Sequence, residues 1–96
     1  MSQSSAAAAS AATSVFCPAN KSTKVWSYTY VGIGYQKFTV KISTNNLTVK
    51  FTKYWNGIPY SWSDDNPTTV NAYPGYTLLY ATPPSDCYIT VVASGL

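Results

Sequence analysis

The sequence predicts an all-β protein, a small single-domain antiparallel β-sandwich of jelly-roll or Ig-like topology with an N-terminal extended arm. Three observations predict this fold. Apolar and polar residues alternate with a period of two along much of the chain, as they do in half-buried strands. Turn residues recur about every 8–12 residues. No long run after residue 15 has the 3.6-residue period of a helix.

The chain begins with an uncharged segment dominated by Ser and Ala, and Val15 is the first bulky apolar residue after Met1. This segment lacks the basic start and apolar centre of a secretory signal, and it is too short and polar to span a bilayer. We expect residues 1–16 to be an assembly arm and residues 17–96 to be the sandwich. The residues expected to contact neighbouring subunits are Ser4, Ser5, Ala6, Ala7, Ala8, Ala9 and Ser10.

The first three predicted strands cover residues 25–31, 35–42 and 47–54. The second and third alternate most regularly, with apolar residues on one face and Lys or Thr on the other. The Ser-Thr-Asn-Asn sequence of residues 43–46 is typical of a hairpin connection. We therefore expect these two strands to be antiparallel neighbours with one solvated face.

A fourth strand is predicted over residues 58–62, directly after the turn sequence Asn56-Gly57. Pro59 lacks a backbone N–H, so this strand is expected at the edge of a sheet.

Three further strands are predicted over residues 68–73, 76–82 and 87–93, with a tight turn at Pro74-Gly75. The last two strands are apolar on both faces. We expect them in the middle of their sheets, where neither face is solvated.

The two cysteines, Cys17 and Cys87, lie seventy positions apart in the sequence. This spacing does not suit a metal site, which needs closer pairs and more ligands. One disulfide, within a chain or between chains, is favoured over two reduced buried thiols because a domain of this size is marginally stable. Closing such a loop contributes about 4 kcal/mol in the chain-entropy model.

The composition argues against enzyme chemistry, because the chain has no His, Arg or Glu and only three Asp. No phosphate-binding loop, nucleophile elbow or zinc motif is present. Asp64 and Asp65 precede Asn66-Pro67, a sequence typical of loops rather than of a glycosidase pair. We predict a protein that is not an enzyme and has no cofactor and no metal.

Aromatic residues gather around two predicted turns, and two interpretations remain open for them. They cover one end of a small sandwich or lie in a subunit interface, or they stack on sugar rings. The candidates are Tyr54, Trp55, Tyr60, Trp62, Tyr73 and Tyr76.

Four of the six lysines are predicted to form a basic face: Lys37, Lys41 and Lys50 on one solvated surface, with Lys53 nearby. Without Arg or placed base-reading side chains, this face is expected to be solvated and to discourage edge pairing, rather than to bind nucleic acid specifically.

The layout of a Ser/Ala-rich arm followed by a short sandwich resembles small jelly-roll structural subunits of virions, of the thermophile or archaeal virus type, and of extracellular or spore-appendage filaments. The resemblance implies a non-enzymatic structural subunit that self-assembles through its N-terminal arm. Its partners would be copies of itself and other structural proteins, outside the cell, in a virion or on a cell or spore surface, without a membrane span. The alternative is a secreted carbohydrate-binding module that uses exposed Trp and Tyr. A small toxin or inhibitor is a third class.

Overall fold

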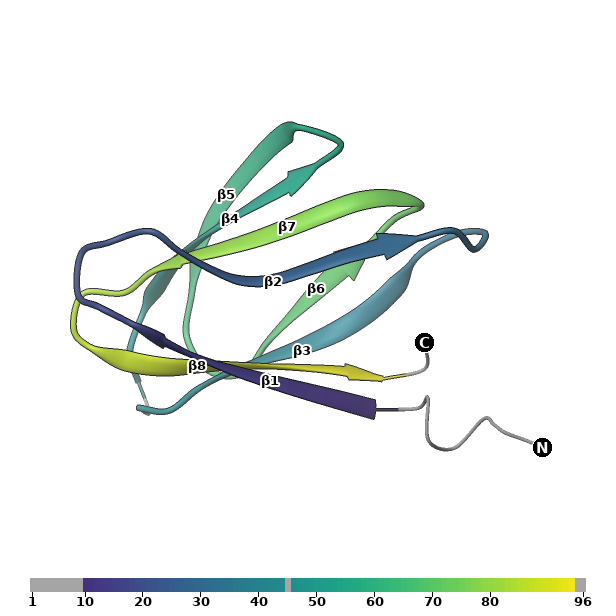
Figure 1. Ribbon diagram of the computed structural model, residues 1–96. Coiled ribbons are helices and arrows are strands. Elements are labelled where there is room, and N and C mark those ends of the chain that lie inside the picture. The colour runs from purple at the N-terminus through teal and green to yellow at the C-terminus, as the bar shows by residue number, and fades with distance from the viewer. Residues whose placement is uncertain (1–9, 45, 95–96) are drawn as a thin grey trace.

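The computed structural model describes residues 10–44 and 46–94, which form eight β-strands and no helix. Two four-stranded antiparallel sheets pack face to face (Figure 1). No membrane-crossing helix occurs in the described residues. The strands are β1 (Ser10–Cys17), β2 (Thr23–Tyr30), β3 (Gln36–Ile42), β4 (Val49–Trp55), β5 (Ile58–Asp64), β6 (Thr68–Ala72), β7 (Gly75–Thr82) and β8 (Cys87–Ser94).

The strand order identifies the sandwich as a jelly roll. One sheet has the order β1-β8-β3-β6 and the other β2-β7-β4-β5. The first strand therefore pairs with the last, the second with the seventh, the third with the sixth and the fourth with the fifth, as in a long hairpin that has been rolled up. An Ig-like sandwich would instead pair its first two strands. The predicted antiparallel sandwich is confirmed, and the pairing selects between its two topologies.

Several predicted features of single strands are also confirmed. Each of β7 and β8 lies between two neighbours, and β5, which contains Pro59, is an edge strand. Asn56 and Gly57 form a two-residue turn between β4 and β5, with positive φ angles of 48° and 84°. Such angles are those of a hairpin turn whose twist matches the flanking strands.

The expected pairing of residues 35–42 with residues 47–54 is wrong. These segments are β3 and β4, and they lie in different sheets. The chain crosses between the sheets after β3, whose end is held by hydrogen bonds from Ile42 N to Asn66 Oδ1 (2.8 Å) and from Ser43 N to Tyr88 O (2.9 Å). Both strands turn an apolar face inward, and these faces meet across the core rather than side by side.

The second part of the expected arm, residues 1–16, is a strand of the sandwich. Residues 10–16 belong to β1, which pairs with β8 in continuous register from Ser10–Ser94 to Cys17–Cys87. Val15 packs against the core, and Cys17 is fully buried. Of the expected arm residues, Ser10 begins β1, whereas Ser4 to Ala9 lie outside the described residues.

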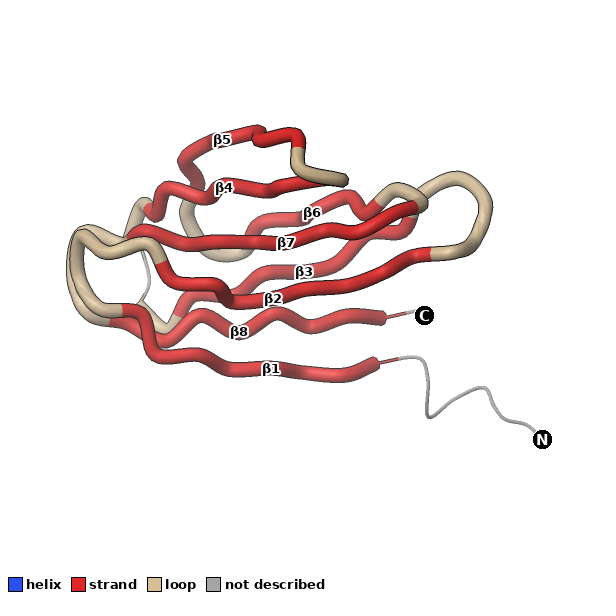
Figure 2. Tube along the Cα trace, turned by 45° about the horizontal axis from the view of Figure 1, so that its top comes forward, coloured by secondary structure: helices blue, strands red, loops and turns tan. Residues whose placement is uncertain are grey.

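The core lies between the two sheets and is built from their inward-facing apolar residues. The largest fully buried side chains include Phe38, Val40, Ile89 and Val91 from one sheet and Val25, Val49, Phe51 and Leu79 from the other. Figure 2 shows that the β2–β3 loop, the β6–β7 turn and the start of β1 lie at the same end of the sandwich. We call this end the arm end, because β1 starts there.

Candidate functional site

The β4–β5 hairpin carries a row of large side chains on the inner face of its sheet. The register places Phe51 opposite Trp62, Lys53 opposite Tyr60, and Trp55 opposite Ile58. Phe51 is fully buried in the core, and residues two apart on a strand point to the same side. Lys53, Tyr60 and Trp62 therefore also point toward the other sheet.

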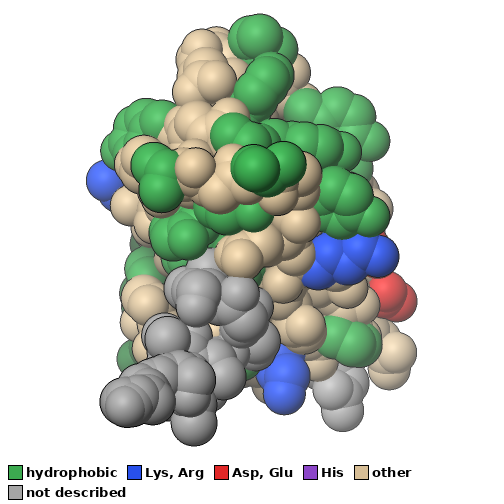
Figure 3. Space-filling view, turned by 90° about the vertical axis from the view of Figure 1, so that its right-hand side faces the viewer, with side chains coloured by type: hydrophobic (Ala, Val, Ile, Leu, Met, Phe, Trp, Pro, Cys, Tyr) green, Lys and Arg blue, Asp and Glu red, His purple; other side chains and the backbone are tan. Residues whose placement is uncertain are grey.

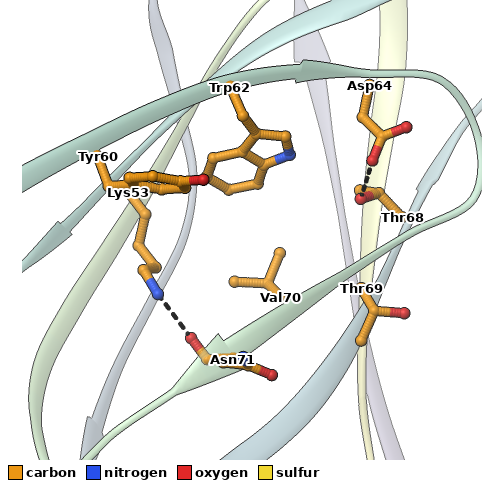
Figure 4. A pocket seen from close by; sticks show the side chains of 8 residues that line it. All are labelled: Lys53, Tyr60, Trp62, Asp64, Thr68, Thr69, Val70 and Asn71. Carbon is orange, nitrogen blue, oxygen red and sulfur yellow. Dashed lines mark hydrogen bonds between the residues drawn. The ribbon is translucent and has the colours of Figure 1, made fainter.

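The opposite sheet does not fully cover this row. Tyr60 is 63% exposed and Ile58 is 61% exposed, although both lie on the inner face. An open groove runs between the edge strands β5 and β6 (Figure 4). It has two adjoining sections of about 270 and 530 Å³ that share Lys53, Tyr60 and Asn71. The wider section also contacts Trp55 and Tyr73.

Stacked rings lead from the core into the groove. The rings of Phe51 and Trp62 are 5.5 Å apart with an interplanar angle of 29°, and those of Trp62 and Tyr60 are 5.6 Å apart at 28°. Phe51 is fully buried, Trp62 is half-buried and Tyr60 is mostly exposed. The exposed ring is thus held in place by rings anchored in the core.

Lys53 supplies the positive charge of the groove. Its Nζ donates a hydrogen bond to the backbone carbonyl of Asn71 (3.0 Å) and lies 5.5 Å from the centre of the Tyr73 ring. Burial lowers the pKa of Lys53, because the partly desolvated ammonium group is less favourable than in water.

Asp64 supplies a negative charge in the narrower section. Its Oδ2 accepts a hydrogen bond from the Thr68 hydroxyl (2.7 Å), and its Oδ1 accepts one from the backbone N–H of Asp65 (2.8 Å). These bonds stabilise the carboxylate, the Thr68 bond most, so the pKa of Asp64 lies below its usual value.

The six aromatic candidates from the sequence do not form one site. Trp55, Tyr60, Trp62 and Tyr73 line the groove. Tyr54 packs edge-to-face on Tyr80 instead, with ring centres 5.7 Å apart. Tyr76 lies at the start of β7, at the arm end, and is 47% exposed.

Sequence reasoning missed the polar side of the groove, Thr69 and Asn71 on β6. Nothing in the local sequence marks these residues. Only the position of β6 beside β5 brings them to the site.

The predicted basic face is corrected. Lys37 and Lys41 lie on the outer face of β3, whereas Lys50 lies on the outer face of β4, in the other sheet. Lys53 points inward, into the groove. The shared face was inferred from a β3–β4 pairing that the jelly-roll topology does not contain.

A second surface feature is an exposed apolar cluster at the arm end. In the β2–β3 loop, Val31 is 91% exposed and Ile33 is 99% exposed. Tyr35 follows them and contacts Tyr73, with ring centres 5.6 Å apart. Figure 3 shows hydrophobic side chains gathered on this end. Contiguous exposed apolar groups, unlike scattered ones, are typical of interaction surfaces.

The free edge of β1 is a third feature. Edge strands usually carry Lys, Pro or a bulge, or are very short, and these devices block pairing with other molecules. Here β5 contains Pro59, β2 contains Lys24 beside a register shift, and β6 has five residues. Strand β1 has eight residues, regular register, no charged side chain and no proline.

Cys17 and Cys87 are directly opposite each other in the β1–β8 pair, and both are buried and not joined by a disulfide in this structure. Burial, and then the neighbouring Cys87, raises the pKa of Cys17 to about 11. Directly opposite residues of an antiparallel pair have Cα atoms about 4.5–5.5 Å apart, within the range of disulfides. The pairing thus permits a disulfide within the chain, which stays a prediction.

Comparisons of the chain with protein-family models, with curated proteins and with solved structures found no match.

Proposed function

We propose that this chain is a non-enzymatic structural subunit that self-assembles through β1 and the residues preceding it. The assembly would be extracellular, as a virion coat component or a surface filament. The observation that carries the proposal is the unprotected free edge of β1, eight residues long.

An open edge of this kind is a template for another strand. Along a free edge, the N–H and C=O groups of alternate residues have no strand partner, and a neighbouring chain can pair with them. Residues 1–9 continue the same character, since they contain no charged side chain and no proline. A strand from a second copy could therefore pair along β1 without burying an unpaired charge.

The exposed apolar cluster at the arm end supports the same proposal. Val31 and Ile33 contribute almost nothing to the core of their own subunit. They belong to the β2–β3 loop, and this loop lies at the same end of the sandwich as the start of β1 (Figure 1). A neighbouring subunit bound along β1 would be well placed to cover them, and burying apolar surface stabilises association.

The proposal is tested by two variants that leave the sandwich intact. Deletion of residues 2–9 removes the segment before β1, and Ala12→Lys places a charge on the exposed face of β1. We expect the full chain to form large regular assemblies in negative-stain microscopy and light scattering. Both variants should stay monomeric, with an unchanged near-ultraviolet circular dichroism spectrum.

The matched control is Ser27→Lys, which adds the same charge to an exposed position of the edge strand β2. This variant should assemble like the parent chain. A parent chain that remains monomeric at all concentrations, or a deletion variant that assembles normally, would contradict the proposal.

A further inference from the structure

We infer that the groove between β5 and β6 is a binding site for a neutral oligosaccharide. This inference goes beyond self-assembly, because the groove lies at the opposite edge of the sandwich from β1. The residues that carry the argument are Lys53, Tyr60, Trp62, Asp64, Thr69 and Asn71.

The first support is an exposed aromatic ring that is already fixed in position. A pyranose ring has an apolar face of C–H groups, which packs against the electron-rich face of an aromatic ring. Tyr60 is 63% exposed, and its ring stacks on Trp62, which stacks on the fully buried Phe51. Because these rings are ordered before a ligand arrives, binding costs little additional side-chain entropy.

The second support is the polar lining around these rings. The Lys53 ammonium group donates one hydrogen bond to Asn71 O, which leaves two of its three protons for a ligand. The Asp64 carboxylate accepts bonds from Thr68 and from the Asp65 N–H and retains further lone pairs. Figure 4 shows Lys53 and Asp64 on opposite sides of the Trp62 ring. The groove therefore offers both donors and acceptors to sugar hydroxyls.

The free edge of β6 adds backbone groups to this lining. The carbonyl of Asn71 points into the groove, since it accepts the Lys53 hydrogen bond there. Residues two apart on an antiparallel strand direct their N–H and C=O groups to the same side. Thr69 therefore also directs its N–H and C=O toward the groove rather than toward β3, the one strand with which β6 pairs.

The charges indicate a neutral ligand. Lys53 and Asp64 carry opposite charges within one groove section, and Asp65 follows directly in the chain. This combination gives no net attraction for nucleic acid or an acidic polysaccharide. The wider section, of about 530 Å³, has a size typical of small-molecule sites, and the narrower section extends it by about 270 Å³. The groove is open along β5, so it suits several sugar units of a chain rather than one enclosed monosaccharide.

Isothermal titration of the full chain with defined hexasaccharides tests this inference. The probes are cellohexaose, mannohexaose and maltohexaose, with hexagalacturonate as the acidic comparison. We expect at least one neutral probe to bind with a dissociation constant of about 1 mM or lower, and more tightly than hexagalacturonate. Tyr60→Ala should weaken this binding roughly tenfold, whereas Tyr60→Phe, which retains the ring, should change it less than about twofold.

The matched control is Tyr88→Ala. Tyr88 is 55% exposed and also packs on an aromatic ring, that of Phe16 (5.4 Å), but it lies outside the groove. This variant should bind like the parent chain, and circular dichroism should show all three variants folded. The inference is overturned if no neutral probe binds, if hexagalacturonate binds most tightly, or if the two alanine variants lose binding equally.

Discussion

The hydrogen bond between Thr68 and Asp64 stabilises the charged carboxylate of the groove. The Thr68 hydroxyl donates to Asp64 Oδ2 over 2.7 Å, and Thr68 is itself buried. This bond is the main reason that the pKa of Asp64 is lowered. Thr68→Val retains the shape of the side chain but removes the donor. We therefore expect a higher pKa of Asp64 in this variant, measured by NMR titration of its carboxyl group.

The same bond links stability to pH. The pKa of Asp64 is lower in the folded protein than in the unfolded chain, where it is about 3.9. The carboxylate therefore stabilises the folded protein above that value, and its contribution is lost as the pH falls through the folded pKa. Denaturant unfolding should show a stability difference between the parent chain and Thr68→Val that shrinks on acidification. An unchanged Asp64 pKa in the variant would contradict this account.

At the scale of elements, we expect β1 to stabilise the fold and the removal of residues 2–9 to affect association alone. Deletion of residues 2–9 should leave the free energy of unfolding nearly unchanged. Deletion of residues 2–17 also removes β1, with the buried Cys17 and the core contacts of Val15. It also leaves β8 as an unprotected edge. We expect this longer deletion to cost more than about 3 kcal/mol, measured by urea unfolding.

The stabilities of the two deletion variants can be compared directly, because both variants are shortened at the same end of the chain. Equal stability of the two variants would show that β1 contributes little to the fold and would contradict the assigned β1–β8 pairing.

The β1–β8 pair also carries the cysteine prediction. We predict that Cys17 and Cys87 form a disulfide within the chain in native assemblies, because the register places them directly opposite each other. Mass spectrometry without reductant should then give a monomer two hydrogens lighter than the reduced chain. Alkylation must be performed on the unfolded chain, because burial raises the pKa of a reduced Cys17 to about 11 and slows its reaction when folded.

Two alkylated thiols in freshly isolated assemblies would contradict the disulfide. A ladder of multiple masses would place the bond between copies instead of within one.

At the scale of the molecule, we expect the exposed apolar residues at the arm end to contribute to association between subunits but not to the stability of one subunit. Ile33 is 99% exposed, so Ile33→Ser should change the free energy of unfolding by less than about 0.5 kcal/mol. If this end is covered in the assembly, the same change should raise the concentration at which subunits associate, measured by sedimentation velocity. Tyr60→Ser, at an exposed aromatic position on β5 at the opposite edge of the sandwich from β1, is the control and should associate normally.

A change in association without a change in folding is the expected result for Ile33→Ser. Normal association of this variant would show that the β2–β3 loop lies outside the subunit interface.

The sequence by itself determined most strands and their buried faces. The alternation around Phe38 and Phe51 located β3 and β4 and their core-facing residues. Pro59 marked an edge strand, and Asn56-Gly57 marked a hairpin turn. These features are local, because side-chain alternation and turn conformation depend on residues only a few positions apart.

Only the tertiary structure decided which strands are neighbours. The residues of β1 were expected to belong to an arm, because their local sequence does not show that they pair with another strand. Their partner β8 begins about seventy residues further along the chain. Lys41 and Lys50 lie on different sheets, because β3 and β4 are not paired. Lys53 Nζ donates a hydrogen bond to Asn71 O, because the jelly-roll topology brings β6 beside the β4–β5 hairpin. Backbone hydrogen bonds between strands are chemically alike for every sequence, so the alternation fixes which face is buried but not which strand lies beside it.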